Sequence, residues 1–330
     1  MLDRRAFTRV AFGTLLAWSC GARAQSRGKI CHVGILRAST RMPSDPILGN
    51  WLGDFMRDLG YIEGQNLRFE EMHADDNVQR IPGLARDMVQ LQPDVIVAIG
   101  TSPTLALKDE TTTIPVVFLT NADPIEVGLV PSLARPGGNI TGVLIAPDGT
   151  LAGKKLEMLR ELVPQATRFA LLVPDDPGVG LKLQVQEAEK AASTLGVELK
   201  VVAVRAGDYD DAFEAISAAR PGGLLVGGHV FFLRDRKQIV ELAAKYRLPA
   251  IYEWPQQVRD GGLMSYGAND GETYRRLAGY VDRICKGARP SDLPIWRPSV
   301  LHLVINLKTA KALGVTIPSS LSQRVDEVIQ

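Results

Sequence analysis

Apolar segments of strand length alternate with amphipathic segments of helix length along most of this chain. Residues 30–36 and 94–99 are strand-length segments made mostly of apolar residues, as expected of strands buried on both faces of a parallel sheet. Segments whose apolar residues recur at helical spacing lie between such runs, for example 47–59 and 78–90. Alternation of this kind builds parallel sheets covered by helices. The sequence therefore predicts an α/β fold.

The alternation occurs twice, on either side of Gly137-Gly138-Asn139. A second array of strands and helices begins near residue 168 and continues to residue 253. Two arrays of similar size in 330 residues predict two doubly wound α/β lobes rather than one large sheet. In open parallel sheets the ligand crevice lies at the carboxyl ends of the strands. The residues directly after each strand are therefore the candidates for a binding site.

The composition is that of a globular protein, with 45% hydrophobic and 23% charged residues and a net charge of +1. A charge so close to zero provides no field that would attract a polyanion, which argues against a nucleic-acid partner. No apolar run reaches the roughly 18–20 residues needed to span a bilayer. Composition thus excludes several classes of protein and identifies none.

Residues 1–24 have the order of a secretory signal peptide. A basic opening at 4–9 precedes an apolar stretch at 10–18 and a small-residue cleavage site at 22–24. Arg4-Arg5 also resembles the twin-arginine export signal, so that route and the general secretory route both stay open. Cys20 could carry a lipid anchor, although the residues before it fit that pattern poorly. We expect a periplasmic protein.

Only Cys31 and Cys285 follow the expected leader. Without the leader, which carries four Arg and one Asp, the net charge falls from +1 to about −2. Two cysteines in an oxidising compartment could form a disulfide. Sequence does not reveal their separation in space, and we expect two separate buried thiols.

The strand ends of the first half carry small polar side chains. Gly100-Thr101-Ser102-Pro103 joins a strand to a helix, where hydroxyls and free backbone N–H groups suit a carboxylate or another anion. The alternative is a plain N-cap in which Thr101 or Ser102 holds the first turn. Asn121 and Asp123 follow the next strand, and Asp123 could receive a ligand ammonium or form an Asx-Pro turn.

Other polar and aromatic side chains follow the remaining strands and complete the candidate site. They are Ser39 in the first half, and Asp175, His229 and Tyr252 in the second. The four histidines are scattered and lack metal-ligand spacing, and the chain has no phosphate-binding loop, nucleophile elbow or dinucleotide fingerprint. We therefore expect a binding site with no catalytic residue, metal or cofactor.

Stretches along the whole chain carry a family pattern. In chain order they are 59–66 (LGYIEGQN), 123–130 (DPIEVGLV), 132–142 (SLARPGGNITG), 248–252 (LPAIY), 261–267 (GGLMSYG) and 304–314 (VINLKTAKALG). They resemble the substrate-binding proteins of ABC importers, specifically the family with a type I periplasmic-binding fold whose characterised relatives take up tryptophan and other aromatic amino acids.

This resemblance implies that the chain crosses between the lobes three times. The first lobe would comprise 25–142 plus 266–290, and the second 143–265 plus 291–330. The three hinge segments would lie near 141–144, 265–267 and 290–293.

The resemblance also implies roles for some strand-end residues. Thr101 and Ser102 match a helix start that can hold a ligand carboxylate, and Asp123 matches a loop that can receive an amino group. Tyr252 and Tyr266 occupy matching places on the second lobe and the hinge.

Two departures from the family pattern fall at expected cleft positions. Residues 174–176 read Pro-Asp-Asp where the family commonly has Asn-Pro, and His229 replaces an Asp or small polar residue. An aromatic amino acid therefore cannot be assumed as the ligand. His229 would bring a group whose charge can change near pH 6–7.

Together these features predict a binding protein that captures a small amphipathic organic solute, amino acid or aromatic acid-like, between two closing lobes. It would act as a monomer and present the solute to an ABC permease in the inner membrane. The alternatives are a sensor for a receptor kinase and an enzyme on the same fold, such as a racemase or hydrolase. A sugar-responsive regulator shares the lobes, but an export signal stands here where such a regulator has a helix-turn-helix.

Overall fold

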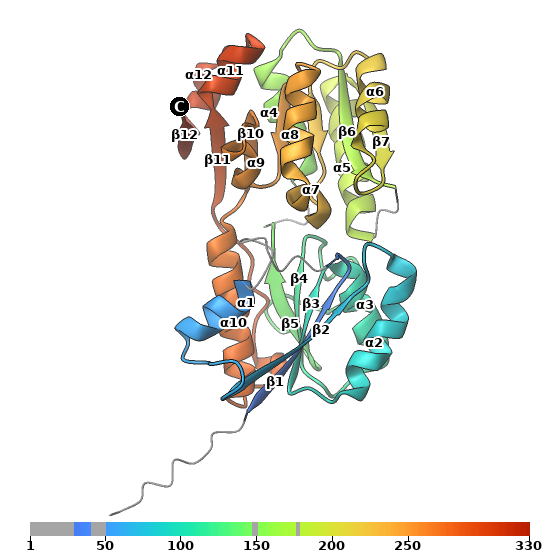
Figure 1. Cartoon of the computed structure of the whole chain (residues 1–330), viewed down its shortest axis with the longest axis vertical. Helices are drawn as coiled ribbons and strands as arrows, with labels where there is room; N and C mark the ends of the chain where they lie inside the picture. The colour runs from blue at the N-terminus through green and yellow to red at the C-terminus, as the bar shows by residue number, and fades with distance from the viewer. Residues whose placement is uncertain (1–29, 41–50, 147–150, 176–178) are drawn as a thin grey trace, which may run out of the picture.

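The computed structural model describes residues 30–40, 51–146, 151–175 and 179–330 (Figure 1). The expected leader at 1–24, with its arginine pair and Cys20, lies outside the described residues. Within the described ranges, no helix combines the length and the hydropathy needed to cross a membrane.

The first lobe is built on a five-stranded sheet in which every pair of neighbours is parallel, in the order β2-β1-β3-β4-β5. Its strands are β1 (Cys31–Arg37), β2 (Leu67–His73), β3 (Val95–Ile99), β4 (Val116–Thr120) and β5 (Ile140–Leu144). Helices α1 (Trp51–Asp58) and α10 (Asp270–Cys285) cover one face, and α2 (Ile81–Gln90) and α3 (Thr101–Glu110) cover the other (Figure 1). A short 3-10 turn, η1 (Val78–Arg80), precedes α2.

The second lobe is built on a seven-stranded sheet in the order β12-β11-β10-β9-β8-β6-β7, in which only β10 and β11 are antiparallel. Its strands are β6 (Arg168–Pro174), β7 (Glu198–Val204), β8 (Leu224–Val226), β9 (Ala250–Tyr252), β10 (Met264–Ala268), β11 (Leu301–Asn306) and β12 (Glu327–Ile329). Its helices are α4 (Ala152–Leu162), α5 (Val179–Leu195), α6 (Tyr209–Ala218), α7 (Val230–Arg234), α8 (Arg236–Lys245), α9 (Pro255–Arg259), α11 (Leu307–Leu313) and α12 (Ser319–Ser322). The predicted fold class, two doubly wound α/β lobes, is confirmed.

The chain passes between the sheets three times: between β5 and α4, between β10 and α10, and between the 3-10 turn η2 (Pro290–Asp292) and β11. All three crossings come a few residues later than the resemblance implied, since β5 belongs to the first sheet as far as Leu144 and β10 belongs to the second as far as Ala268. Leu293 packs in the core of the first lobe, and Trp296 pairs with Val143 of β5. β5 is the edge strand of its sheet, so the returning chain satisfies hydrogen-bonding groups that would otherwise stay open.

Cys31 and Cys285 form a disulfide, with their Cα atoms 5.8 Å apart. The expectation of two separate thiols is therefore wrong. Cys31 begins β1 and Cys285 ends α10, and the packing of α10 against the first sheet brings them together. The bond joins the first segment of the lobe to the segment that returns from the second lobe, across a sequence separation of 254.

Removing this disulfide should destabilise the protein substantially. In the variant Cys31→Ala/Cys285→Ala, we expect the free energy of unfolding to fall by about 3–5 kcal/mol, because the bond closes a long loop and restricts the unfolded chain. Urea unfolding of the variant and of the reduced wild-type protein would measure this. Equal unfolding midpoints for the oxidised wild type and the variant would contradict it.

Candidate functional site

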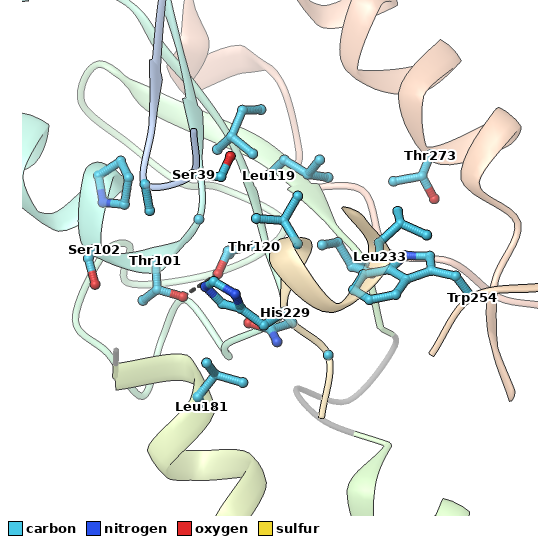
Figure 2. A pocket seen from close by; sticks show the side chains of 18 of the residues that line it. Ser39, Thr101, Ser102, Leu119, Thr120, Leu181, His229, Leu233, Trp254 and Thr273 are labelled. Atoms are coloured by element: carbon cyan, nitrogen blue, oxygen red, sulfur yellow. Dashed lines mark hydrogen bonds between the residues drawn. The ribbon is translucent and has the colours of Figure 1, made fainter. Parts of the chain in front are cut away.

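A cavity of about 150 Å³ lies between the two lobes, at the carboxyl ends of the strands (Figure 2). The first lobe lines it with Ala38, Ser39, Val78, Ile99, Gly100, Thr101, Ser102, Pro103, Leu119, Thr120, Asn121, Ile145, Thr273 and Tyr274. The second lobe lines it with Leu181, Gly228, His229, Val230, Leu233 and Trp254. The predicted residues Ser39, Thr101, Ser102, Asn121 and His229 are all in this cavity wall.

The start of α3 opens onto the cavity without a side-chain cap. Its N-cap is Gly100, whose φ of 108° is a conformation that favours glycine. Thr101 and Ser102 are the first two helical residues, so neither is the plain N-cap that the sequence left open as an alternative. The positive end of the α3 dipole therefore faces the cavity with polar side chains around it.

Two hydroxyls beside this helix start share one hydrogen bond. Thr101 Oγ1 and Thr120 Oγ1 are 2.6 Å apart, and Thr120 Oγ1 also accepts from the backbone N–H of Ala122 at 3.2 Å. Each hydroxyl has one proton, and only one of the two protons is used in the hydrogen bond between them. The other is available to the cavity, although Thr101 is only 6% exposed and Thr120 only 1%.

His229 is the N-cap of α7, and its Nδ1 accepts a hydrogen bond from the backbone N–H of Phe231 at 3.4 Å. Burial lowers the pKa of His229 from 6.5 to about 4, and the opposing charges of Asp76 and Arg234 act on it in opposite directions. The imidazole is therefore neutral at neutral pH, with its proton on Nε2. The charge change is therefore shifted below the pH 6–7 range expected from the sequence, because burial disfavours the charged imidazole.

Part of the cavity wall is apolar. Trp254 packs in a small cluster with Leu233 and Val230 on the second lobe. Leu119 and Ile145 face the same cavity from the first lobe. Trp254 was not among the predicted site residues; its position two residues after the end of β9 was the available signal in the sequence.

Four predicted residues do not line this cavity: Asp123, Tyr252, Tyr266 and Asp175. Asp123 Oδ1 accepts from the backbone N–H groups of Ile125 at 2.7 Å and Glu126 at 3.3 Å, which is the Asx-turn alternative. Tyr252 is 0% exposed in the core of the second lobe, and Tyr266 packs against the core on the other face of that sheet. Both tyrosines belong to strands of the second sheet, and their side chains pack in the core of that lobe.

Asp175 lies in a second cavity, of about 260 Å³, which shares His229 with the first. Its carboxylate pairs with Arg205, whose Nε lies 2.9 Å from Asp175 Oδ2. The charge of Asp175 is therefore matched within the protein, and this predicted residue stands beside the first cavity rather than in its wall.

An ion pair joins the lobes next to His229. Arg234 of α7 lies 2.9 Å from Asp76, which follows β2 in the first lobe. Arg234 also binds Asp235 through two nitrogens, and Asp76 accepts from Thr40 at 3.2 Å. Sequence reasoning missed this pair, because nothing in either segment signals that the two meet.

The described wall of the first cavity carries no formal charge. None of the described residues that line it is Asp, Glu, Lys or Arg. Among the same described ranges, no group of three or more His, Cys, Asp or Glu side chains could hold a metal ion. The arrangement offers hydrogen-bond donors on one side and apolar contacts on the other, which suits the binding of a small organic solute.

Comparisons with known proteins find relatives that match most of this chain. The tyrosine-binding protein of Clostridioides difficile is 25% identical over 262 residues, which cover 79% of this chain and 74% of that protein. A conserved domain protein from Vibrio cholerae has a solved structure that is 26% identical, with a TM-score of 0.78 over 91% of this chain and 100% of that one. A domain from Streptococcus pneumoniae solved with L-Trp is 24% identical, with a TM-score of 0.76 over 90% of this chain and 100% of that one.

The family pattern recognised in the sequence is confirmed by a match over most of the chain. The model of the ABC transporter substrate binding protein family matches residues 50–329. This chain belongs to the family of ABC transporter substrate-binding proteins.

Proposed function

We propose that this protein is the extracytoplasmic solute-binding component of an ABC importer. It captures a small amphipathic organic solute, amino acid or aromatic acid-like, and delivers it to a permease in the inner membrane. The observation that carries the proposal is the cavity between the lobes. The first lobe lines it with the uncapped start of α3 and with hydroxyl groups, and the second lobe lines it with Trp254. We also propose that the protein acts as a monomer in the periplasm.

The division of the site between two lobes supports a mechanism of closure. A solute that contacts Thr101 on one lobe and Trp254 on the other stabilises the arrangement in which the lobes meet. The solute shifts the populations toward the closed form only because it binds that form more tightly than the open form. The Arg234–Asp76 ion pair adds a contact between the lobes that does not need the solute.

The relatives support the ligand class in part. One binds tyrosine by its name, and another was solved with L-Trp. The apolar half of the cavity agrees with a ring or another compact apolar group, and the hydroxyl half agrees with a carboxylate.

Replacing Thr101 with valine should weaken solute binding at least tenfold. Valine keeps the shape of the side chain but removes the hydroxyl, so a buried acceptor on the solute loses its donor. The solute can be identified by native mass spectrometry of the purified protein, and its affinity then measured by calorimetry in both proteins.

Two matched variants separate binding from folding. Thr104→Val makes the same change one turn along α3, where the hydroxyl bonds the Gly100 carbonyl and does not face the cavity. Asp123→Ala removes a turn contact. We expect both to lower thermal stability and to keep wild-type affinity. Wild-type affinity in Thr101→Val would contradict the site, and turnover of the solute would contradict the proposed function.

A further inference from the structure

We infer that the solute is a ring-bearing monocarboxylate without an ammonium group, rather than a zwitterionic amino acid. This inference rests on the proposed function, because it concerns the same cavity. It follows from the partners that the charged groups around the cavity have within the protein.

The carboxylates nearest to the cavity already have partners. Asp76 pairs with Arg234 at 2.9 Å, and Asp175 pairs with Arg205 at 2.9 Å. Asp123 accepts from two backbone N–H groups.

Glu253, directly before the cavity residue Trp254, forms a buried ion pair with Lys155. Among the described residues around the cavity, each of these four carboxylates therefore has at least one partner, although Asp76 Oδ1 is buried without a hydrogen bond. None of the four lines the cavity wall, and Asp76 lies in the wall of the neighbouring cavity instead.

An ammonium group in this cavity would be costly. Burial of an ionised amine without an opposite charge carries a large desolvation penalty, and hydroxyl or amide oxygens recover only part of it. A carboxylate in the same cavity would be stabilised, because the polar groups of the cavity wall are mainly hydrogen-bond donors.

Three kinds of donor meet at the first-lobe side. The uncapped first turn of α3 presents backbone N–H groups, with the positive end of the helix dipole behind them. The Thr101–Thr120 pair has one unused hydroxyl proton. His229 is neutral and has its proton on Nε2, because Nδ1 is an acceptor for Phe231.

The opposite side accommodates a ring. Trp254, Leu233 and Leu119 present apolar surface, and the cavity measures about 150 Å³. An apolar cavity of about this volume holds a benzene molecule. A carboxylate at the start of α3 and a ring against Trp254 would use both halves of the site.

Calorimetry with three matched pairs tests this inference on the full protein freed of bound solute. The pairs are 3-phenylpropionate and L-phenylalanine, 3-(4-hydroxyphenyl)propionate and L-tyrosine, and indole-3-propionate and L-tryptophan. Members of a pair differ only by the ammonium group. We expect the acid without the ammonium group to bind at least one hundredfold more tightly in the pair that contains the best ligand.

Equal or tighter binding of the amino acid in that pair would overturn the inference and leave the proposed function standing. The same holds if neither member of any pair binds while another small solute raises the melting temperature. If no small solute binds at all, both the inference and the proposed function fail.

The variant Asn121→Asp provides a second test within the cavity wall. Asn121 is half-buried at the end of β4, and aspartate has the same shape but adds a negative charge. We expect the affinity ratio of acid to amino acid to fall at least tenfold in this variant. Asn121→Ala, which removes the amide without adding charge, should leave the ratio unchanged. An unchanged ratio in Asn121→Asp would overturn the inference.

Discussion

Replacing Lys155 with methionine should lower the free energy of unfolding by about 3–5 kcal/mol. Lys155 of α4 is 2% exposed, and its ammonium group pairs with the carboxylate of Glu253, which is 7% exposed. Loss of the cation leaves the carboxylate buried without its counter-charge, and the desolvation cost of that carboxylate is then uncompensated. Urea unfolding followed by tryptophan fluorescence would measure the effect.

A neighbouring lysine provides the control for this prediction. Lys154 pairs with Glu157 at 2.7 Å, and about half of each of these side chains is exposed to water. Lys154→Met should therefore change stability by less than about 1 kcal/mol. Equal losses of unfolding free energy in the two methionine variants would contradict the importance of burial. If the unpaired buried carboxylate of Glu253 causes the loss, the double variant Lys155→Met/Glu253→Leu should recover most of it.

The buried pair matters for the cavity because of where Glu253 lies. It directly precedes Trp254, and its carboxylate packs beside Gly228, where an added Cβ would lie 3.0 Å from Glu253 Oε2. The backbone N–H of Gly228 donates to Gln184 Oε1 at 3.0 Å. The ion pair thus underlies the loop that carries His229 into the cavity wall.

Lowering the pH from 7 to 4 should cost the folded protein up to about 3 kcal/mol at His229 alone. Burial lowers the pKa of His229 from 6.5 to about 4 in the folded state. As the pH falls through 6.5, the unfolded chain binds a proton that the folded protein does not. The stability from the neutral imidazole is therefore fully present above pH 6.5 and is lost progressively toward pH 4.

The variant His229→Gln isolates this contribution. Asp76 and Arg234 act on the imidazole in opposite directions, and Asp175 and Arg205 of the neighbouring cavity are paired with each other, so burial dominates. We expect the difference in unfolding free energy between wild type and variant to shrink by about 3 kcal/mol from pH 7 to pH 4. Parallel stability curves for the two proteins across that range would contradict the assignment.

Local sequence pattern predicted the parts of the site that depend on strand ends. All five of the predicted residues that line the cavity lie within three residues of the end of a strand: Ser39, Thr101, Ser102, Asn121 and His229. The pattern works because parallel strands end at one edge of a sheet, so residues distant in the chain converge there. It does not distinguish a residue inside the strand, such as Tyr252, from one just beyond it, such as Trp254.

Pairing between distant residues could not be predicted in the same way. Asp123 and Asp175 were candidate ligand contacts by position, yet their oxygens bind backbone N–H groups and Arg205 within the protein. A carboxylate has the same sequence appearance whether it faces a ligand or a cation of its own chain. Which of the two it meets depends on the geometry of several segments at once.

By itself, the sequence determined the α/β class, the two arrays and the family pattern, because apolar periodicity and turn residues are local properties. Only the tertiary structure decided that Cys31 bonds Cys285, that Arg234 meets Asp76 across the lobes and that the described cavity wall is uncharged. These contacts form because the chain leaves each lobe and later returns to it. They join residues that are far apart in the sequence, and no local sequence pattern indicates that such residues are close in space.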